Sequence, residues 1–166
     1  MNFRIMNTAP KNLSLGELAP RISALNQDEK LIVFEELYNK GTTLIYFYPK
    51  ADTPGCTAEA CSLRDAWEAL RDMAGQKIQI LGVSKDKPKS QKKFQQKYQL
   101  PFDLIADVDG KVAQAFHVPL IPIAGMSKRQ SFLIQDGKIV WFSLKAKTKE
   151  AAEQIQFALD EIKRND

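Results

Sequence analysis

Cysteine and histidine are scarce in this chain of 166 residues, which holds two cysteines and one histidine. A structural zinc site takes four such ligands, so the Cys and His residues of the chain cannot fill one unaided. The cysteines, Cys56 and Cys61, do not form a Cys-x-x-Cys pair. Because general disulfide oxidoreductases normally use that motif, its absence argues against this class of enzyme.

Long apolar runs are also missing. No stretch approaches the roughly 18 apolar residues that a membrane helix needs. The segment from Met1 to Lys11 is short and mixed and has no apolar stretch before a small-residue cleavage site, so we expect no secretory signal. These features predict a cytoplasmic protein without a membrane partner, in which a stapling disulfide is not expected. Two cysteines five residues apart therefore need another explanation.

The composition is that of a globular domain, with 44% hydrophobic and 27% charged residues. A net charge of +4 makes the chain mildly basic, and the basic residues are densest between Lys85 and Lys97. Such a run is one feature of nucleic-acid-binding proteins. This one lacks the interleaved aromatics and glycines of an RNA-binding surface. We therefore expect a solvated helix face and no nucleic-acid partner.

Apolar runs typical of buried strands alternate along the chain with segments of helical period. This order predicts a mixed α/β fold, with a parallel-rich sheet, helices on both faces and a late antiparallel hairpin at Asp136-Gly137. Residues 1–15 are expected to be an irregular extension and residues 16–166 a single domain. The expected strands are 42–48, 78–83, 102–106, 130–135 and 138–142, and the expected helices are 56 to about 75, 88–98, 109–116 and 149–162.

Cys56 occupies a position where chemistry is often found. The strand 42–48 ends in a turn rich in Pro and Gly, and a helix whose first turn contains Cys56 follows. Sites gather at the carboxyl ends of strands in open α/β sheets. A helix N-terminus also offers free N–H groups and positive dipole charge, which favour the thiolate and lower the pKa of a cysteine. Thr53 is expected to cap the helix or to direct its hydroxyl toward a ligand. The alternative is that both cysteines are inert buried hydrophobes.

Cys61 lies about 7.5 Å further along a continuous helix and about 140° around it from Cys56. A disulfide needs Cα atoms within roughly 7 Å and converging Cβ vectors. The two cysteines therefore cannot bond while the helix is intact. If they pair during a reaction, the first turns of the helix have to unwind.

The motif around Cys56 resembles a known family. Pro49, Thr53 and Cys56 fit the pattern P-x-x-x-T-x-x-C, which is the active-site signature of the peroxiredoxins. The longer run YFYPKADTPGCTAEACSLRD resembles the bacterioferritin-comigratory-protein branch, also called peroxiredoxin Q. In that branch the second cysteine lies five residues after the first, as Cys61 does here.

Two further segments support this resemblance. Arg129 leads the run RQSFLI, and the family has an arginine before a similar strand. The segment GELAP at residues 16–20 is similar to an N-terminal element of the family. The resemblance extends over about residues 16–163 and implies a thioredoxin-like fold with a mixed central sheet flanked by helices.

The resemblance implies a thiol-dependent peroxidase that reduces hydrogen peroxide and organic hydroperoxides. Cys56 would be the peroxidatic cysteine and form a sulfenic acid, and Cys61 would resolve it as an intramolecular disulfide. Arg129 and Thr53 would polarise the peroxide bond and hold the thiolate, with the Cys56 N–H orienting the peroxide. Pro49 would shield the pocket from water.

A thioredoxin or a glutaredoxin-like protein is the partner that the resemblance implies, as the reductant of the disulfide. No metal, haem or flavin is required. The family favours a monomer, with a dimer as the alternative. A redox sensor or holdase, in which oxidation of Cys56 signals by unwinding the helix, is a non-enzymatic alternative.

Three further features are the loop 117–126, Glu59 and Arg64, and the interpretation of the loop and of Arg64 stays open. The apolar loop 117–126 departs from the more polar loop of the family, which indicates either a preference for bulkier organic peroxides or a packing or association surface. Glu59 is expected in the first turn, where a carboxylate suits the helix dipole. Arg64, one turn after Cys61, has either a surface ion pair with Glu68 or a redox role.

Overall fold

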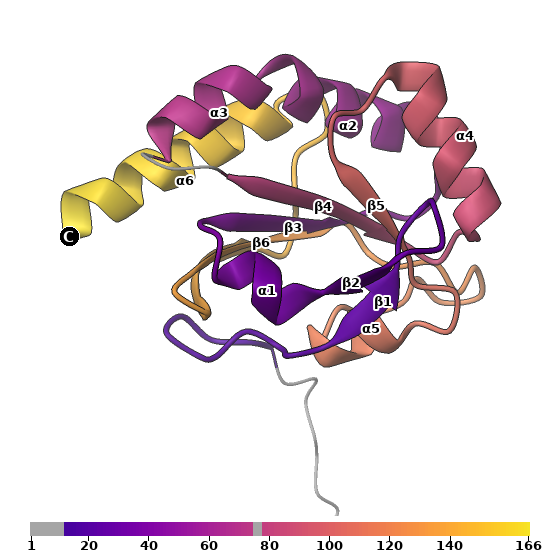
Figure 1. Cartoon of the computed structure of the whole chain (residues 1–166), viewed down its shortest axis with the longest axis horizontal. Coiled ribbons are helices and arrows are strands. Elements are labelled where there is room, and N and C mark those ends of the chain that lie inside the picture. Colours follow the sequence, from indigo (N-terminus) through magenta and orange to yellow (C-terminus); the bar gives the residue numbers. More distant parts are fainter. Residues whose placement is uncertain (1–11, 75–77) are drawn as a thin grey trace, which may run out of the picture.

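A five-stranded sheet forms the centre of the molecule, in the order β5-β4-β3-β6-β7 (Figure 1). The structure is a computed structural model, and it describes residues 12–74 and 78–166. The strand β3 is parallel to β4, which is parallel to β5, whereas β6 is antiparallel to both β3 and β7. The sheet is therefore mixed, as predicted. Its strands are β3 (Thr43–Phe47), β4 (Gln79–Ser84), β5 (Asp103–Ala106), β6 (Gln130–Gln135) and β7 (Lys138–Ser143).

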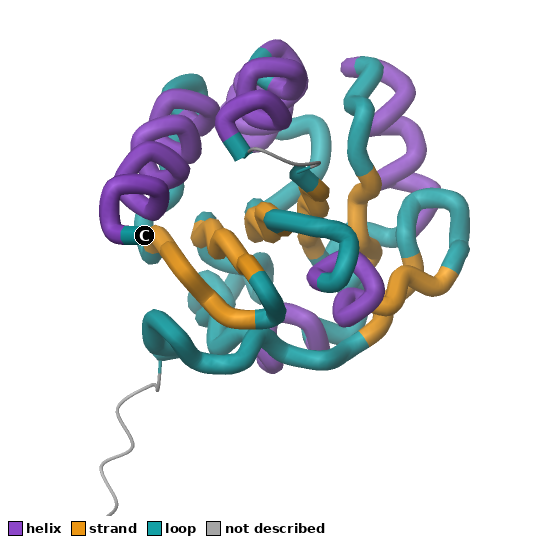
Figure 2. Tube along the Cα trace, turned by 60° about the vertical axis from the view of Figure 1, so that its left-hand side comes forward, coloured by secondary structure: helices purple, strands orange, loops and turns teal. Residues whose placement is uncertain are grey.

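The central strand β3 is buried on both faces because its side chains alternate between two hydrophobic clusters. Leu44 and Tyr46 belong to one cluster, and Ile45 and Phe47 belong to the other. Helices cover both faces of the sheet, which confirms the predicted layers (Figures 1 and 2). The first face carries α2 (Pro54–Asp65), α3 (Trp67–Met73), α4 (Pro88–Tyr98) and α6 (Ala151–Asn165), and the second carries α1 (Phe34–Tyr38) and α5 (Lys111–Ala115).

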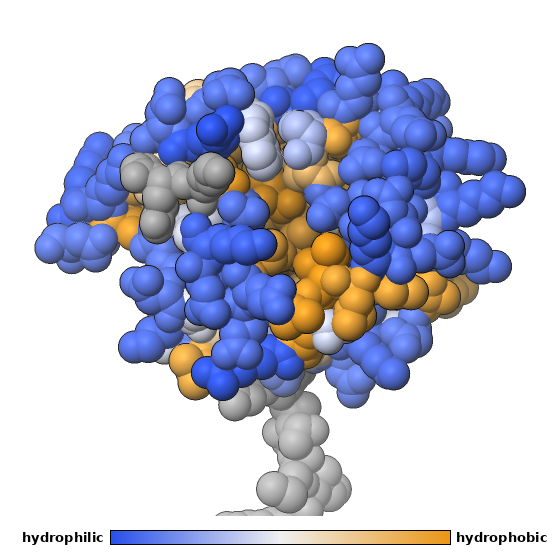
Figure 3. Space-filling view, viewed as in Figure 1, coloured by the Kyte–Doolittle hydropathy of each residue, from blue (hydrophilic) through white to orange (hydrophobic). Residues whose placement is uncertain are grey.

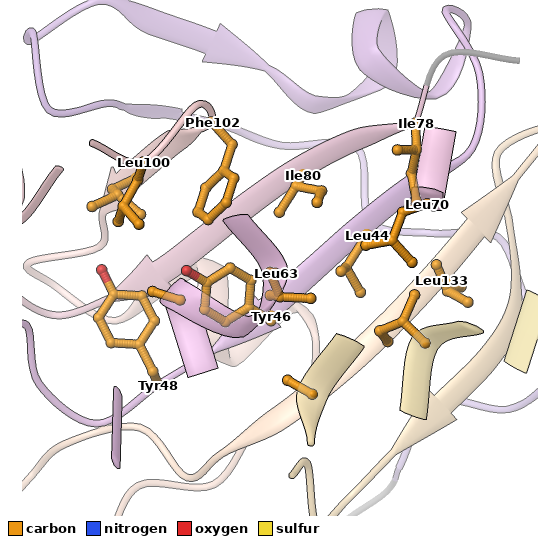
Figure 4. Packing of buried hydrophobic residues seen from close by; sticks show 14 of the residues in the cluster. Leu44, Tyr46, Tyr48, Leu63, Leu70, Ile78, Ile80, Leu100, Phe102 and Leu133 are labelled. Carbon is orange, nitrogen blue, oxygen red and sulfur yellow. The ribbon is translucent and has the colours of Figure 1, made fainter. Parts of the chain in front are cut away.

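The first cluster is packed closely around two tyrosines, Tyr46 in β3 and Tyr48 directly after it (Figure 4). The rings of Tyr46 and Tyr48 stack with their centroids 5.5 Å apart. Next to them β4 has a glycine, Gly82, where an added Cβ would lie 2.8 Å from the ring and the hydroxyl of Tyr46. Only a residue without a side chain leaves room for that ring between the sheet and the helices.

Three features of the fold differ from the predictions, one of which is the short helix α1, which was not expected. The long helix expected after Cys56 breaks at Ala66 into α2 and α3, although the N–H of Ala66 still bonds to Ser62 O at 3.2 Å and the N–H of Leu70 to Ala66 O at 2.9 Å. Leu70 thus stays buried with the α2 residues in the first cluster despite the break. A two-stranded hairpin, β1 (Ser23–Leu25) and β2 (Leu31–Val33), was not predicted, because these strands are short and only partly buried. The expected helix end at Gly75 lies outside the described residues.

The described part of the N-terminal segment contacts the domain. Leu13 and Ala19 are buried in the second cluster, and the N–H of Gly16 and of Ala19 bond to carbonyl groups of the β6–β7 hairpin at 2.8 Å. Of the expected extension 1–15, residues 1–11 lie outside the described residues. Within the described ranges, no helix is long and apolar enough to cross a membrane.

Apolar side chains gather on one face of the molecule, over β1, β2 and the connection from β5 to α5 (Figure 3). Leu25, Leu31 and Val108 are exposed there and line a groove. This surface lies over the hairpin that the sequence pattern did not reveal.

Candidate active site

The end of β3 places the segment that carries Cys56. The N–H of Tyr48 bonds to Val83 O at 3.0 Å, and after this last sheet contact the chain turns away from the sheet at Pro49. The helix α2 then begins at Pro54, which suits the first helical position because its missing N–H would have no partner there. Cys56 is the third residue of the helix and only 1% exposed. Cys56 therefore packs in the first cluster. It lies in the first turn of α2, where the backbone N–H groups have no partner within the helix.

Arg129 reaches this turn because of the strand register. β6 pairs antiparallel with β3 so that Gln130 is opposite Phe47, which brings the residue before β6 beside the turn after β3. The guanidinium Nη2 of Arg129 lies 3.3 Å from Cys56 Sγ. Gly55 allows this approach, since an added Cβ would lie 3.2 Å from the same nitrogen. A cation at this distance stabilises negative charge on the sulfur.

Glu59 shares the guanidinium with Cys56. Its Oε1 lies 2.7 Å from Arg129 Nη1, and its side chain is 1% exposed. Burial raises the pKa of Glu59 to about 8, and Arg129 only partly opposes this shift. Near neutral pH the carboxyl therefore keeps its proton and accepts a hydrogen bond from Arg129. The positive charge of the guanidinium then remains available to the sulfur.

The expected place of Glu59 at the helix dipole is wrong. The first turn of α2 has no acidic residue, and Glu59 lies in the next turn with its side chain buried toward Arg129. The spacing of three residues between Cys56 and Glu59 could have indicated this arrangement. Residues three apart share one helix face, so a residue at this distance from Cys56 faces the same group.

Thr53 is the residue before α2, but its hydroxyl does not cap the helix as one of the two expectations had it. Thr53 Oγ1 instead donates a hydrogen bond of 2.7 Å to Lys50 O. This bond closes the turn between Pro49 and α2 and fixes the hydroxyl beside the first helical turn. The oxygen keeps its lone pairs, so the hydroxyl can still accept a hydrogen bond from a ligand. Pro49 is half-buried at the start of the turn.

Cys61 lies in the same unbroken helix as Cys56, and both thiols are free. Cys61 is half-buried, in contrast to the buried Cys56. The expected ion pair between Arg64 and Glu68 is wrong. Arg64 Nε bonds to Asp65 Oδ1 at 2.9 Å, and its Nη1 bonds to Tyr98 O at 2.8 Å. The pKa of Arg64 is raised by the hydrogen bond with Asp65 and, to a smaller extent, by the neighbouring Cys61.

Tyr46 adds a buried hydroxyl near these groups. Among the described residues its Oη has no hydrogen-bond partner. Burial raises the pKa of Tyr46 well above its ordinary value, and Tyr48, Glu59 and both cysteines add to the shift. The phenol is therefore neutral, and no sequence motif points to this residue.

The fold and the site define a thioredoxin-like α/β protein with a free, buried thiol beside an arginine at a helix start. A family model described as the AhpC/TSA family matches residues 15–142, and the chain belongs to that family. A relative named putative peroxiredoxin bcp, from Coxiella burnetii, is 40% identical over 107 residues, which are 64% of this chain and 68% of the relative. A chloroplastic peroxiredoxin Q from Populus jackii is 31% identical over 136 residues, which are 82% of this chain and 62% of the relative.

A solved structure gives the same answer. The bacterioferritin comigratory protein of Xanthomonas campestris, whose structure is described with its alkyl peroxide reduction activity, matches with a TM-score of 0.75 and 28% sequence identity. The match covers 87% of this chain and 96% of that one. The predicted branch is thereby confirmed. The activity class that follows is a thiol-dependent peroxidase.

Proposed function

We propose that Cys56 is the peroxidatic cysteine of this peroxidase, that Cys61 resolves it, and that residues 16–166 form the catalytic domain. The observation that carries the proposal is the contact of 3.3 Å between Arg129 Nη2 and Cys56 Sγ at the start of α2. This contact joins a nucleophile, a cation and a helix N-terminus at one point. Reduction of a peroxide needs these groups, since negative charge moves from sulfur to oxygen as the O–O bond breaks.

In the first step the thiolate of Cys56 attacks one oxygen of the hydroperoxide. The S–O bond forms as the O–O bond breaks, and the leaving oxygen takes a proton and departs as water or an alcohol. Arg129 and the Cys56 N–H stabilise the charge on the two oxygens, and the Thr53 hydroxyl positions the peroxide. Pro49 keeps water away from the sulfenic acid that results.

In the second step the thiolate of Cys61 attacks the sulfenic sulfur of Cys56. The S–S bond forms, the S–O bond breaks, and hydroxide leaves and is protonated to water. The turns of α2 between the two cysteines unwind for this step, because an intact helix holds their Cα atoms too far apart. A dithiol protein, thioredoxin or a glutaredoxin-like reductant, then reduces the disulfide by exchange. Neither step calls for a metal or an organic cofactor.

Hydrogen peroxide and organic hydroperoxides are the proposed substrates. The reported alkyl peroxide reduction by the Xanthomonas relative supports the organic class. In the apolar loop 117–126, Leu120 and Ile123 are exposed, which favours the association surface over the alternative of a bulky-peroxide pocket. We propose a cytoplasmic protein. The family resemblance favours a monomer, whereas the exposed loop supports a dimer as the alternative.

The experiment that tests these roles is stopped-flow oxidation of the reduced protein by hydrogen peroxide, followed by intact mass. We expect the wild type to lose two hydrogen atoms, Cys61→Ser to stop at the sulfenic acid or beyond, and Cys56→Ser to be inert. Oxidation of Cys56→Ser at the wild-type rate would show that the nucleophile is misassigned. Repeated turnover with a thioredoxin system separates a catalyst from a sensor, which reacts once.

A further inference from the structure

Tyr98, the last residue of α4, contacts both ends of the segment that carries the two cysteines. Its Oη donates a hydrogen bond of 2.8 Å to Asp52 Oδ1, in the turn before α2. Its backbone carbonyl accepts the bond of 2.8 Å from Arg64 Nη1, three residues after Cys61. One residue of α4 is thus hydrogen-bonded to both Asp52 and Arg64, the two ends of the segment that contains Cys56 and Cys61.

The bond to Asp52 is one of a pair. Lys97 Nζ lies 2.9 Å from Asp52 Oδ2 and 3.1 Å from its Oδ1, so the carboxylate has two donors on α4. These donors lower the pKa of Asp52, which stays ionised at neutral pH. Asp52 has a φ of +59°, in the left-handed region that costs a non-glycine residue conformational energy. The two bonds therefore hold the turn in a conformation that the free chain disfavours.

The disulfide requires the opposite of this arrangement. Cys56 and Cys61 meet only when the first turns of α2 unwind, and the unwinding segment is the one tied at Asp52 and at Arg64. While both ends are held, that segment has little freedom to rearrange. Release at Asp52 frees the turn before α2 and lets Cys56 move toward Cys61.

We propose that Tyr98, with Lys97, is a latch on Asp52 that holds Cys56 in the helix for attack on peroxide, and that its opening limits formation of the disulfide. This inference rests on the proposed function of the two cysteines. Tyr98 is a positioning residue, because it acts through its hydrogen bond to Asp52.

The latch has a chemical consequence for the sulfenic acid. Until the helix opens, the sulfenate of Cys56 stays in the pocket, where a second hydroperoxide can oxidise it. In that reaction the sulfur gains one oxygen to become sulfinic acid, and the peroxide leaves as water or an alcohol. A tighter latch therefore favours over-oxidation, and a looser latch favours the disulfide.

The test is the variant Tyr98→Phe. It removes the bond to Asp52 but keeps the backbone carbonyl for Arg64 and the ring that packs on Phe94 at a centroid distance of 5.5 Å. Stopped-flow fluorescence separates the second-order oxidation of Cys56 from the first-order formation of the disulfide. We expect disulfide formation to accelerate about three- to tenfold, the effect of one hydrogen bond to a charged group at an exposed site. The oxidation step should stay within about twofold of wild type, and less sulfinic acid should form per turnover.

The matched control is Tyr38→Phe. The hydroxyl of Tyr38 donates to Pro20 O at 3.0 Å in the other hydrophobic cluster, so this variant loses one comparable bond away from α2. We expect no change in either step. A second variant, Lys97→Met, removes the other donor to Asp52 and should act in the same direction as Tyr98→Phe.

The outcomes separate the latch from the proposed function. If the wild type forms no disulfide between Cys56 and Cys61, the resolving step fails and the latch fails with it. If the wild type forms the disulfide and both Tyr98→Phe and Lys97→Met form it at the wild-type rate, the latch alone is wrong. Equal changes in oxidation and disulfide formation would also overturn it, since these indicate general loosening of the fold.

Discussion

Arg129 donates hydrogen bonds to Cys56 and Glu59 at once, through separate nitrogens of one guanidinium. The two acceptors have different roles in the proposed mechanism. Burial keeps the proton on Glu59, whereas Cys56 is the group that carries the attacking negative charge in the mechanism we propose. This difference directs the single positive charge of the pair toward the sulfur.

The variant Arg129→Met should therefore slow oxidation of Cys56 by on the order of 100- to 1000-fold, the usual cost of a lost charge-stabilising donor. Arg129→Lys should recover part of the rate, because it keeps the charge but cannot contact both acceptors in the same fork. Stopped-flow oxidation by hydrogen peroxide measures both. A wild-type rate for a folded Arg129→Met would remove the guanidinium from the mechanism.

The rate of oxidation should also depend on the ionisation of Glu59. As the pH rises through about 8, the carboxyl loses its proton and competes with Cys56 for the charge of Arg129. We expect the second-order rate constant of the wild type to fall there, relative to Glu59→Gln. The glutamine keeps the hydrogen bond to Arg129 and does not titrate. The same fall in Glu59→Gln would assign it to another group.

The same pKa makes a prediction for stability. Glu59 has a pKa of about 8 in the folded chain and an ordinary value of 4.5, so the folded state keeps a proton that the unfolded state releases. The contribution of Glu59 to the free energy of unfolding is complete below about pH 4.5 and is lost as the pH rises to about 8. Urea unfolding of the reduced protein across this window should show the free energy of unfolding falling more steeply in the wild type than in Glu59→Gln. Parallel curves would show that the carboxyl is ionised in the fold.

Much of the fold could be predicted because each strand of the main sheet contains a short apolar run. The helix α4 has the predicted bounds, and the hairpin at Asp136-Gly137 joins β6 and β7 as expected. The three-residue strands β1 and β2 have no comparable pattern. The break at Ala66 was also hidden, because the apolar face continues across it into Leu70.

Within the site, the turn and the helix start around Cys56 could be predicted locally, but its long-range partners could not. The resemblance supplied Arg129 as a candidate, and the contact with Cys56 depends on Gln130 being opposite Phe47. That register is a property of the folded sheet. The bonds from α4 to Asp52 likewise join residues more than 40 apart, for which spacing gives no signal.

Tyr46 leads to a last prediction, in which removing a polar atom should stabilise the protein. Its Oη is buried without a hydrogen-bond partner among the described residues, and an unsatisfied buried hydroxyl carries an uncompensated desolvation cost. Tyr46→Phe keeps the ring that stacks on Tyr48 and removes only that oxygen. We expect the free energy of unfolding to rise by about 1 kcal/mol in urea titrations of the reduced protein.

The matched comparison is Tyr48→Phe, since the hydroxyl of Tyr48 is buried in the same cluster but bonds to Gln91. That variant leaves the buried Gln91 Oε1 without this hydrogen-bond donor and should lower the free energy of unfolding by about 1 to 3 kcal/mol. Opposite signs for two neighbouring Tyr→Phe changes would tie the effect to hydrogen-bond satisfaction, because the rings are retained in both. If Tyr46→Phe is destabilising instead, its hydroxyl has a partner in solution, and the nearby thiols of Cys56 and Cys61 become the groups to examine by the same change in each cysteine variant.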